Sequence, residues 1–126
     1  MKKSVLIIED NEQNMYMLTY LMQSQNFDIF QAFNGIDGIN LANEKKPDII
    51  LLDIQLPKMD GYSVAKKLRE SDDLKTTPII VVTSYAMVGD KEKAIASGAT
   101  GYIEKPIDPD TFIQQMNSFL PSHLID

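Results

Sequence analysis

The sequence contains no cysteine and only one histidine, His123, among its 126 residues. Without cysteine the chain has no disulfide, no thiolate nucleophile and no cysteine-ligated metal centre, and it fits a reducing compartment. Long apolar runs are missing as well. The first run, residues 5–8, stops at Glu9, which makes it too short for a signal peptide or a membrane span. We therefore expect a cytoplasmic protein that does not bind membranes.

Positive charge is also scarce. Twelve Lys and Arg residues stand against eighteen Asp and Glu residues, and the formal net charge is −6, with no run of basic residues. Such a chain is a poor partner for the phosphate backbone of a nucleic acid, so we expect no nucleic-acid binding. The length and the 44% hydrophobic content fit one domain, residues 1–126, with a core over about 4–120, a short C-terminal tail and no second domain.

Short aliphatic runs alternate with segments of helical spacing along the whole chain. Three runs of large aliphatic residues, 5–8, 49–52 and 79–82, are typical of strands buried on both faces of a parallel sheet. Weaker strands are predicted over 27–33 and 100–104. The segments between and after the strands predict helices near residues 11–25, 35–46, 62–69, 89–97 and 112–120. The sequence therefore predicts five β-α units.

Strands that alternate with helices require right-handed crossovers and a parallel sheet that is covered on both faces. We predict an α/β fold, the flavodoxin-like doubly wound (βα)5 sheet with strand order 2-1-3-4-5. This order places the first and third strands side by side. Polar side chains follow four of the five strands: Glu9 and Asp10, Asp53, Thr83 and Ser84, and Lys105.

The carboxyl ends of parallel strands meet at one edge of the sheet, where open α/β sheets bind ligands. Glu9, Asp10 and Asp53 should therefore lie close together, and their mutual repulsion is relieved either by a bound proton or by a cation. Oxygen ligands without cysteine or histidine suit Mg²⁺. A carboxylate in such a site can also be a nucleophile toward phosphorus, with a metal ion and a lysine neutralising the transferred group. Asp53, at the end of the third strand, is the central candidate.

The same residues resemble the receiver domains of two-component response regulators over essentially the whole chain. Glu9-Asp10 is similar to the acidic pair of that family, and Asp53 to its phosphoacceptor. Thr83 resembles the switch hydroxyl, and Tyr102 the rotating aromatic residue. Lys105-Pro106 resembles the pair whose lysine contacts the phosphoryl group across a peptide bond that is usually cis.

Four stretches most resemble the stand-alone, DivK-like receivers: residues 9–12, 53–57, 86–90 and 105–107. Ser84 departs from the family pattern, because many receivers have alanine or another small residue there. Its hydroxyl would lie where it can contact the phosphoryl group.

The resemblance implies a single-domain response regulator rather than a turnover enzyme. A histidine kinase or a histidine phosphotransfer protein would donate its phosphoryl group to Asp53. Mg²⁺, or Mn²⁺ as a substitute, would be held by Asp10, Asp53 and the backbone carbonyl of Gln55, with Glu9 acting through a water molecule. Thr83 and Lys105 would then contact the phosphoryl group.

In the same scheme, Tyr102 turns inward after phosphorylation and reshapes the surface formed by the fourth helix, the fifth strand and the fifth helix, where a downstream target protein would bind. The loop residue Tyr85, two positions beyond Thr83, stands where the family tunes the access of water. His123 lies in the tail, so the chain has no well-placed histidine of its own to act as phosphodonor.

Each of these residues has a plainer interpretation when taken alone. Asp53 could be a turn residue, Glu9-Asp10 a favourable helix N-terminus, and Lys105 a solvated charge. Two alternative functions stay open: a pseudo-receiver interaction module and a phosphatase of the haloacid-dehalogenase type. The second lacks a convincing Asp-x-Asp pattern after the first strand. A flavodoxin-like electron carrier is disfavoured because residues 11–14 do not form a small-residue phosphate loop.

Overall fold

The computed structural model describes residues 2–84 and 89–125 of the chain. Five parallel strands form one sheet in the order β2-β1-β3-β4-β5, as predicted. The strands are β1 (Ser4–Ile8), β2 (Asp28–Ala32), β3 (Ile49–Leu52), β4 (Ile79–Thr83) and β5 (Gly101–Glu104). The α-helices are α1 (Glu12–Ser24), α2 (Gly35–Lys45), α3 (Gly61–Glu70), α4 (Asp90–Ala96) and α5 (Phe112–Asn117).

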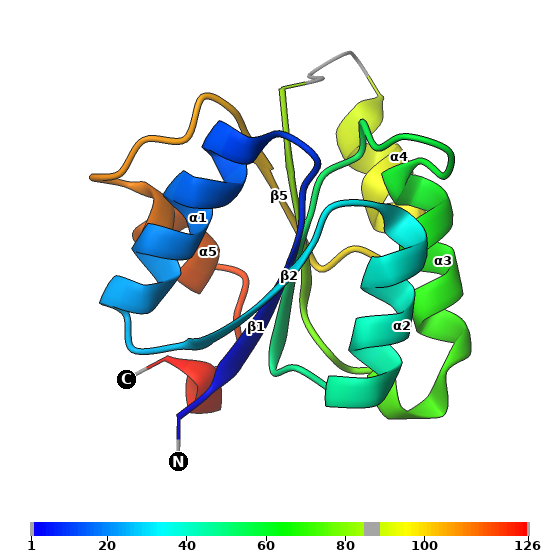
Figure 1. The fold of residues 1–126 in the computed structure, drawn as a ribbon, viewed down its shortest axis with the longest axis horizontal. Helices are drawn as coiled ribbons and strands as arrows, with labels where there is room; N and C mark the ends of the chain where they lie inside the picture. The colour runs from blue at the N-terminus through cyan, green and yellow to red at the C-terminus, as the bar shows by residue number, and fades with distance from the viewer. Residues whose placement is uncertain (1, 85–88, 126) are drawn as a thin grey trace.

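The helices cover both faces of the sheet (Figure 1). α1 and α5 lie on one face, and α2, α3 and α4 lie on the other. Alternate residues of each strand point to opposite faces. Val5 and Ile7 therefore belong to the core that α1 and α5 cover, whereas Leu6 and Ile8 belong to the core beneath α2 and α3. This double burial explains why the strands are runs of aliphatic residues without polar alternation.

Two short 3₁₀ helices interrupt the predicted loops. η1 (Asp72–Leu74) falls in the acidic segment after α3. Asp72 and Asp73 are exposed, but Leu74 is fully buried in the core beneath α2 and α3, and its burial fixes the turn. The segment is therefore an anchored turn rather than a free linker.

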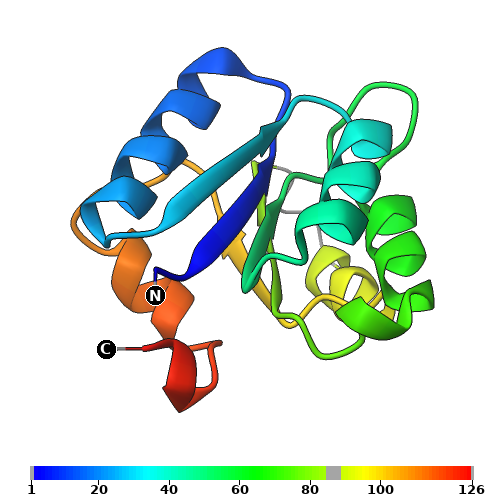
Figure 2. The ribbon, with the colours of Figure 1, turned by 60° about the horizontal axis from the view of Figure 1, so that its bottom comes forward.

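The last helix is shorter than predicted. α5 ends at Asn117, whereas the apolar spacing had suggested about residue 120. The backbone N–H of Leu120 donates to the carbonyl of Asn117 in a tighter turn, which lets Leu120 reach the core. Leu124, in η2 (Ser122–Leu124), is then buried in the core that α1 and α5 cover. The ribbon of η2 follows α5 and lies near the N-terminal end of the chain (Figure 2). Among residues 2–84 and 89–125, no helix is both long and apolar enough to cross a membrane.

Candidate functional site

Three carboxylates meet at the carboxyl edge of the sheet. β1 and β3 are neighbours, with Ile8 paired to Leu52, so the residues that follow them emerge side by side. The backbone N–H of Asp53 donates to the carbonyl of Ile8 at 3.0 Å, which fixes this adjacency. Glu9, Asp10 and Asp53 each offer an oxygen, and these oxygens lie within 4.8 Å of one another. The expected cluster of acids is therefore present in the structure.

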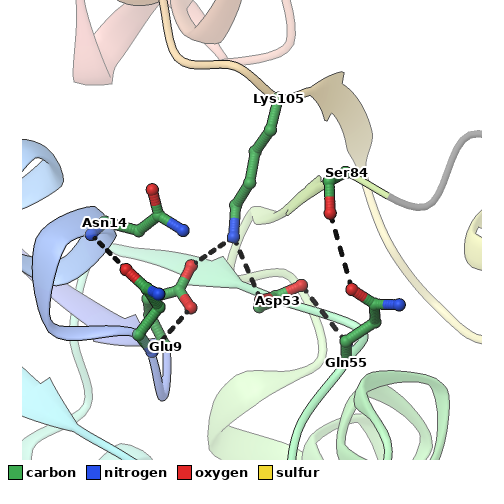
Figure 3. A network of polar contacts seen from close by, with 7 residues as sticks. Glu9, Asn14, Asp53, Gln55, Ser84 and Lys105 are labelled. Atoms are coloured by element: carbon green, nitrogen blue, oxygen red, sulfur yellow. Dashed lines mark hydrogen bonds and ion pairs between the residues drawn. The ribbon is translucent and has the colours of Figure 1, made fainter.

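Lys105 bridges two of these acids. Its Nζ donates to Glu9 Oε1 at 2.6 Å and to Asp53 Oδ2 at 3.1 Å (Figure 3). The three side chains are only 9%, 1% and 6% exposed, respectively, so this is a buried charge network. Lys105 lies in the turn directly after β5, where its backbone N–H donates to the carbonyl of Thr83 at 2.8 Å. This hydrogen bond positions its side chain in the network.

Burial shapes the acid–base properties of this network. Burial raises the pKa of Glu9 to about 7, although the hydrogen bonds from Lys105 and from the backbone N–H of Asn11 act in the opposite direction. For Lys105, burial lowers the pKa, but the hydrogen bond to Glu9 and the charge of Asp53 outweigh it, and the net pKa is raised. The ammonium therefore stays charged, and Glu9 holds its proton more readily than an exposed glutamate.

The loop after Asp53 is tightly folded. Asp53 Oδ1 accepts a hydrogen bond from the backbone N–H of Gln55 at 3.2 Å. The N–H of Gly61 donates to the carbonyl of Ile54 at 2.8 Å, which folds the start of α3 back onto this loop. A Cβ atom at Gly61 would collide with the backbone carbonyl of Asp53. Asp60 caps α3 by accepting from the N–H of Ser63. Position 61 therefore needs glycine for close packing.

The hydroxyl residues and the aromatic residue lie at the ends of β4 and β5. Thr83 closes β4 and is fully buried, and Ser84 Oγ contacts Gln55 Oε1 at 3.5 Å. Tyr102 is half-buried and packs against the small cluster that contains Ile54. The Lys105–Pro106 peptide bond is cis, the isomer expected from the sequence. Tyr85 lies outside the described residues.

One further pair near the site could not be predicted from the sequence. Tyr62, in the first turn of α3, donates its hydroxyl to Asp90 Oδ1 at 3.3 Å, in the first turn of α4. Lys93 Nζ lies 4.6 Å from the centre of the Tyr62 ring. Helical spacing within α3 cannot reveal this contact, because it depends on how two separate helices pack.

The donor set fits a hard divalent cation. All three side chains of the acidic cluster offer carboxylate oxygens, and Asp10 is exposed, so an entering ion can reach the cluster from solvent. Mg²⁺ commonly binds through one or two carboxylates and retains several water molecules. The chemistry and spacing of these residues therefore suit Mg²⁺, and the Lys105 ammonium, which is bonded to Glu9 and Asp53, lies beside the same cluster.

The sequence matches the family model of the response regulator receiver domain over residues 5–117. It is also similar to proteins named polar-differentiation response regulator DivK. The identity is 42% over 120 residues for the relative from Brucella anthropi, covering 95% of this chain and 98% of that one. The relative from Brucella ovis is 41% identical over the same length, with the same coverage.

Solved structures give the same result. A chemotaxis response regulator of Vibrio cholerae superimposes with a TM-score of 0.90 at 27% identity, covering 95% of this chain and all of that one. The receiver domain of a sensor histidine kinase from Pseudomonas aeruginosa, with a magnesium ion coordinated in its active site cleft, gives a TM-score of 0.85 at 27% identity. That match covers 94% of this chain and 98% of the other.

Proposed function

The chain belongs to the response regulator receiver domains, and we propose that it accepts a phosphoryl group on Asp53. One observation carries the assignment: the carboxylate of Asp53 lies at the end of a central strand, hydrogen-bonded to Lys105 and next to Glu9 and Asp10. Lys105 supplies a positive charge for the incoming phosphoryl oxygens. The neighbouring acids supply a site for the cation that the transfer needs.

The transfer is a displacement at phosphorus. A carboxylate oxygen of Asp53 attacks the phosphorus of a phosphohistidine, the new O–P bond forms and the N–P bond breaks. The bonding electron pair leaves with the imidazole nitrogen. The hydrogen bonds from the N–H of Gln55 and from Lys105 hold the carboxylate of Asp53 in a fixed orientation, which reduces the entropic cost of reaching the transition state.

We propose that Asp10, Asp53 and the backbone carbonyl of Gln55 hold Mg²⁺, or Mn²⁺ in its place, with Glu9 acting through a water molecule. When bound, the ion neutralises the negative charge that develops on the phosphoryl oxygens. The all-oxygen donor set supports this proposal.

After transfer, Thr83 and Ser84 are proposed to contact phosphoryl oxygens that Lys105 also binds. Thr83 is the last residue of β4, and Ser84 is the next residue along the chain. The carbonyl of Thr83 accepts a hydrogen bond from the N–H of Lys105, which joins the end of β4 to the turn after β5. Tyr102, on β5, is the proposed aromatic switch. Its half-buried ring is available to change its exposure when the end of β4 moves.

Partners of two kinds follow from this scheme. The phosphodonor is a histidine kinase or a histidine phosphotransfer protein, which we place on α1 and on the loops around Asp53. The target of the signal is a downstream protein, which we place on the surface of α4, β5 and α5. The family makes this a signalling protein rather than an enzyme that turns over an external substrate. The pseudo-receiver and phosphatase alternatives are not favoured.

Phosphoramidate, which carries a P–N bond like that of phosphohistidine, tests the proposal directly. The parent chain incubated with phosphoramidate and Mg²⁺ should gain the mass of one phosphoryl group, and Asp53→Asn should gain none. Asp60→Asn is the matched control, since Asp60 is an exposed carboxylate of the same loop that caps α3. A parent chain that gains no mass, or an Asp53→Asn variant that gains as much as the parent, contradicts the proposal.

A further inference from the structure

The helix α4 is weakly held by its own sequence. It has seven residues, its N-cap is Gly89, whose φ is +93°, and no side chain in the described part of the chain caps its N-terminus. A helix this short is marginal without tertiary contacts. Among its residues only Ala94 is buried, in a cluster with Ile54, Val81 and Ala99. The contacts made by other elements therefore decide where α4 lies.

Tyr62 makes several of those contacts. Its ring packs against the cluster that contains Ala94, its hydroxyl donates to Asp90, and Lys93 lies over its face. Positions 90, 93 and 94 share one side of a helix. The side chain of Tyr62 thus contacts α4 along the face that carries the buried Ala94.

The backbone next to Tyr62 is held against the loop that follows Asp53. Gly61, next to Tyr62, is hydrogen-bonded to the carbonyl of Ile54 and lies against the backbone of Asp53. Tyr62 and Ile54 also belong to the same cluster. A shift of the loop after Asp53 therefore reaches Tyr62 through direct packing.

The electrostatic surroundings agree with this geometry. Burial, followed by the charge of Asp90, raises the pKa of Tyr62 to about 12, and the pKa of Tyr102 is raised by burial and by the same carboxylate. The hydroxyls of both tyrosines therefore stay protonated at neutral pH. Both tyrosine rings also pack against the cluster that contains Ile54, and the charge of Asp90 acts on both hydroxyls.

We propose that Tyr62 is a positioning residue of the phosphorylation switch, which tethers the first turn of α4 to the first turn of α3 while Asp53 is unmodified. Movement of α4 must break the hydrogen bond to Asp90 and separate the ring from Lys93. The tether therefore opposes the rearrangement and sets how readily the chain reaches its phosphorylated form. This role rests on the proposed function of Asp53.

The test compares Tyr62→Phe with Tyr16→Phe. The first removes the hydroxyl that binds Asp90 and keeps the ring, and the second removes a hydroxyl from a tyrosine that is 75% exposed on α1. Amide hydrogen exchange of residues 90–96 should become about two- to tenfold faster in Tyr62→Phe, the range that corresponds to the net contribution of one ordinary hydrogen bond. Phosphorylation by phosphoramidate with Mg²⁺ should accelerate by a similar factor. Tyr16→Phe should change neither rate.

Lys93→Met, with the exposed Lys91→Met as its control, probes the ring contact independently and should accelerate both rates about two- to fivefold. Unchanged exchange in α4 for both test variants shows that there is no tether. Faster exchange with unchanged phosphorylation shows that the contact is structural only, and overturns the switching role. A parent chain that takes no phosphoryl group overturns the proposed function, and the role of Tyr62 in switching with it.

Discussion

Replacing Lys105 by methionine removes the ammonium that bridges Glu9 and Asp53 while keeping most of the volume of the side chain. Breaking a buried pair by removing one partner typically costs ~3–5 kcal/mol of folding free energy. The cost here should be about 2 kcal/mol at neutral pH, because Glu9, whose pKa is already about 7, can take up a proton and relieve the repulsion from Asp53.

The informative quantity is the dependence of this cost on Mg²⁺. Metal that binds only the folded chain adds stability of RT ln(1 + [Mg²⁺]/Kd), or about 2.7 kcal/mol at a hundred times Kd. The ammonium of Lys105 competes for oxygens of the same acidic cluster. The variant should therefore bind Mg²⁺ more tightly than the parent and gain more stability from it.

Urea unfolding in EDTA and in excess Mg²⁺ measures both effects, and Lys66→Met, an exposed lysine of α3, is the control. We expect the Lys105→Met deficit to be large in EDTA and to shrink or vanish in Mg²⁺, with no effect from Lys66→Met. An equal deficit under both conditions would refute the reasoning, because it would show that metal and ammonium do not share the acidic oxygens.

Of three further predictions, two concern the site and one concerns Arg69, whose partners lie before β4 and β5, at the opposite edge of the sheet. Gly61→Ala should lower the free energy of unfolding by about 1–3 kcal/mol and slow phosphorylation by phosphoramidate, since its methyl group would push on the backbone of Asp53. An unchanged phosphorylation rate in variant protein that urea unfolding shows to be stably folded would contradict this. Arg69→Met should lower the free energy of unfolding in urea by about 3 kcal/mol, because the guanidinium donates to three backbone carbonyls, and a loss as small as that of Lys66→Met would count against it. The Mg²⁺ affinity measured by calorimetry should rise between about pH 6 and 8 and then level off, because Glu9 must lose its proton, whereas a flat profile would argue against a raised pKa for Glu9.

The aliphatic runs allowed most of the fold to be predicted. Residues 5–8, 49–52 and 79–82 are buried on both faces of a parallel sheet, and strands of this type have few other solutions. The meeting of Glu9 and Asp53 followed from the strand order alone, since β1 and β3 are neighbours. The resemblance to receiver domains was confirmed by the family match over residues 5–117.

The parts that could not be predicted depend on packing between distant segments. The acidic character of residues 70–73 masked the anchoring role of Leu74, whose burial decides the turn. The apolar stripe of the last helix continues to Leu120, but the backbone leaves the α-helical path after Asn117 and still buries that leucine. The contact between Tyr62 and Asp90 depends on how closely α3 and α4 pack, and the spacing of residues within each helix does not determine that packing.

The location of the phosphoryl group tests the central claim most directly. Borohydride reduces an aspartyl phosphate to homoserine, so treatment of the parent chain after incubation with phosphoramidate and Mg²⁺ marks the acceptor permanently. Peptide mapping by mass spectrometry should find homoserine at position 53 alone, and none when Mg²⁺ is replaced by EDTA. Homoserine at Asp10 or Asp60, or no homoserine at all in protein that has gained a phosphoryl group, would contradict the assignment of Asp53 as the phosphoacceptor.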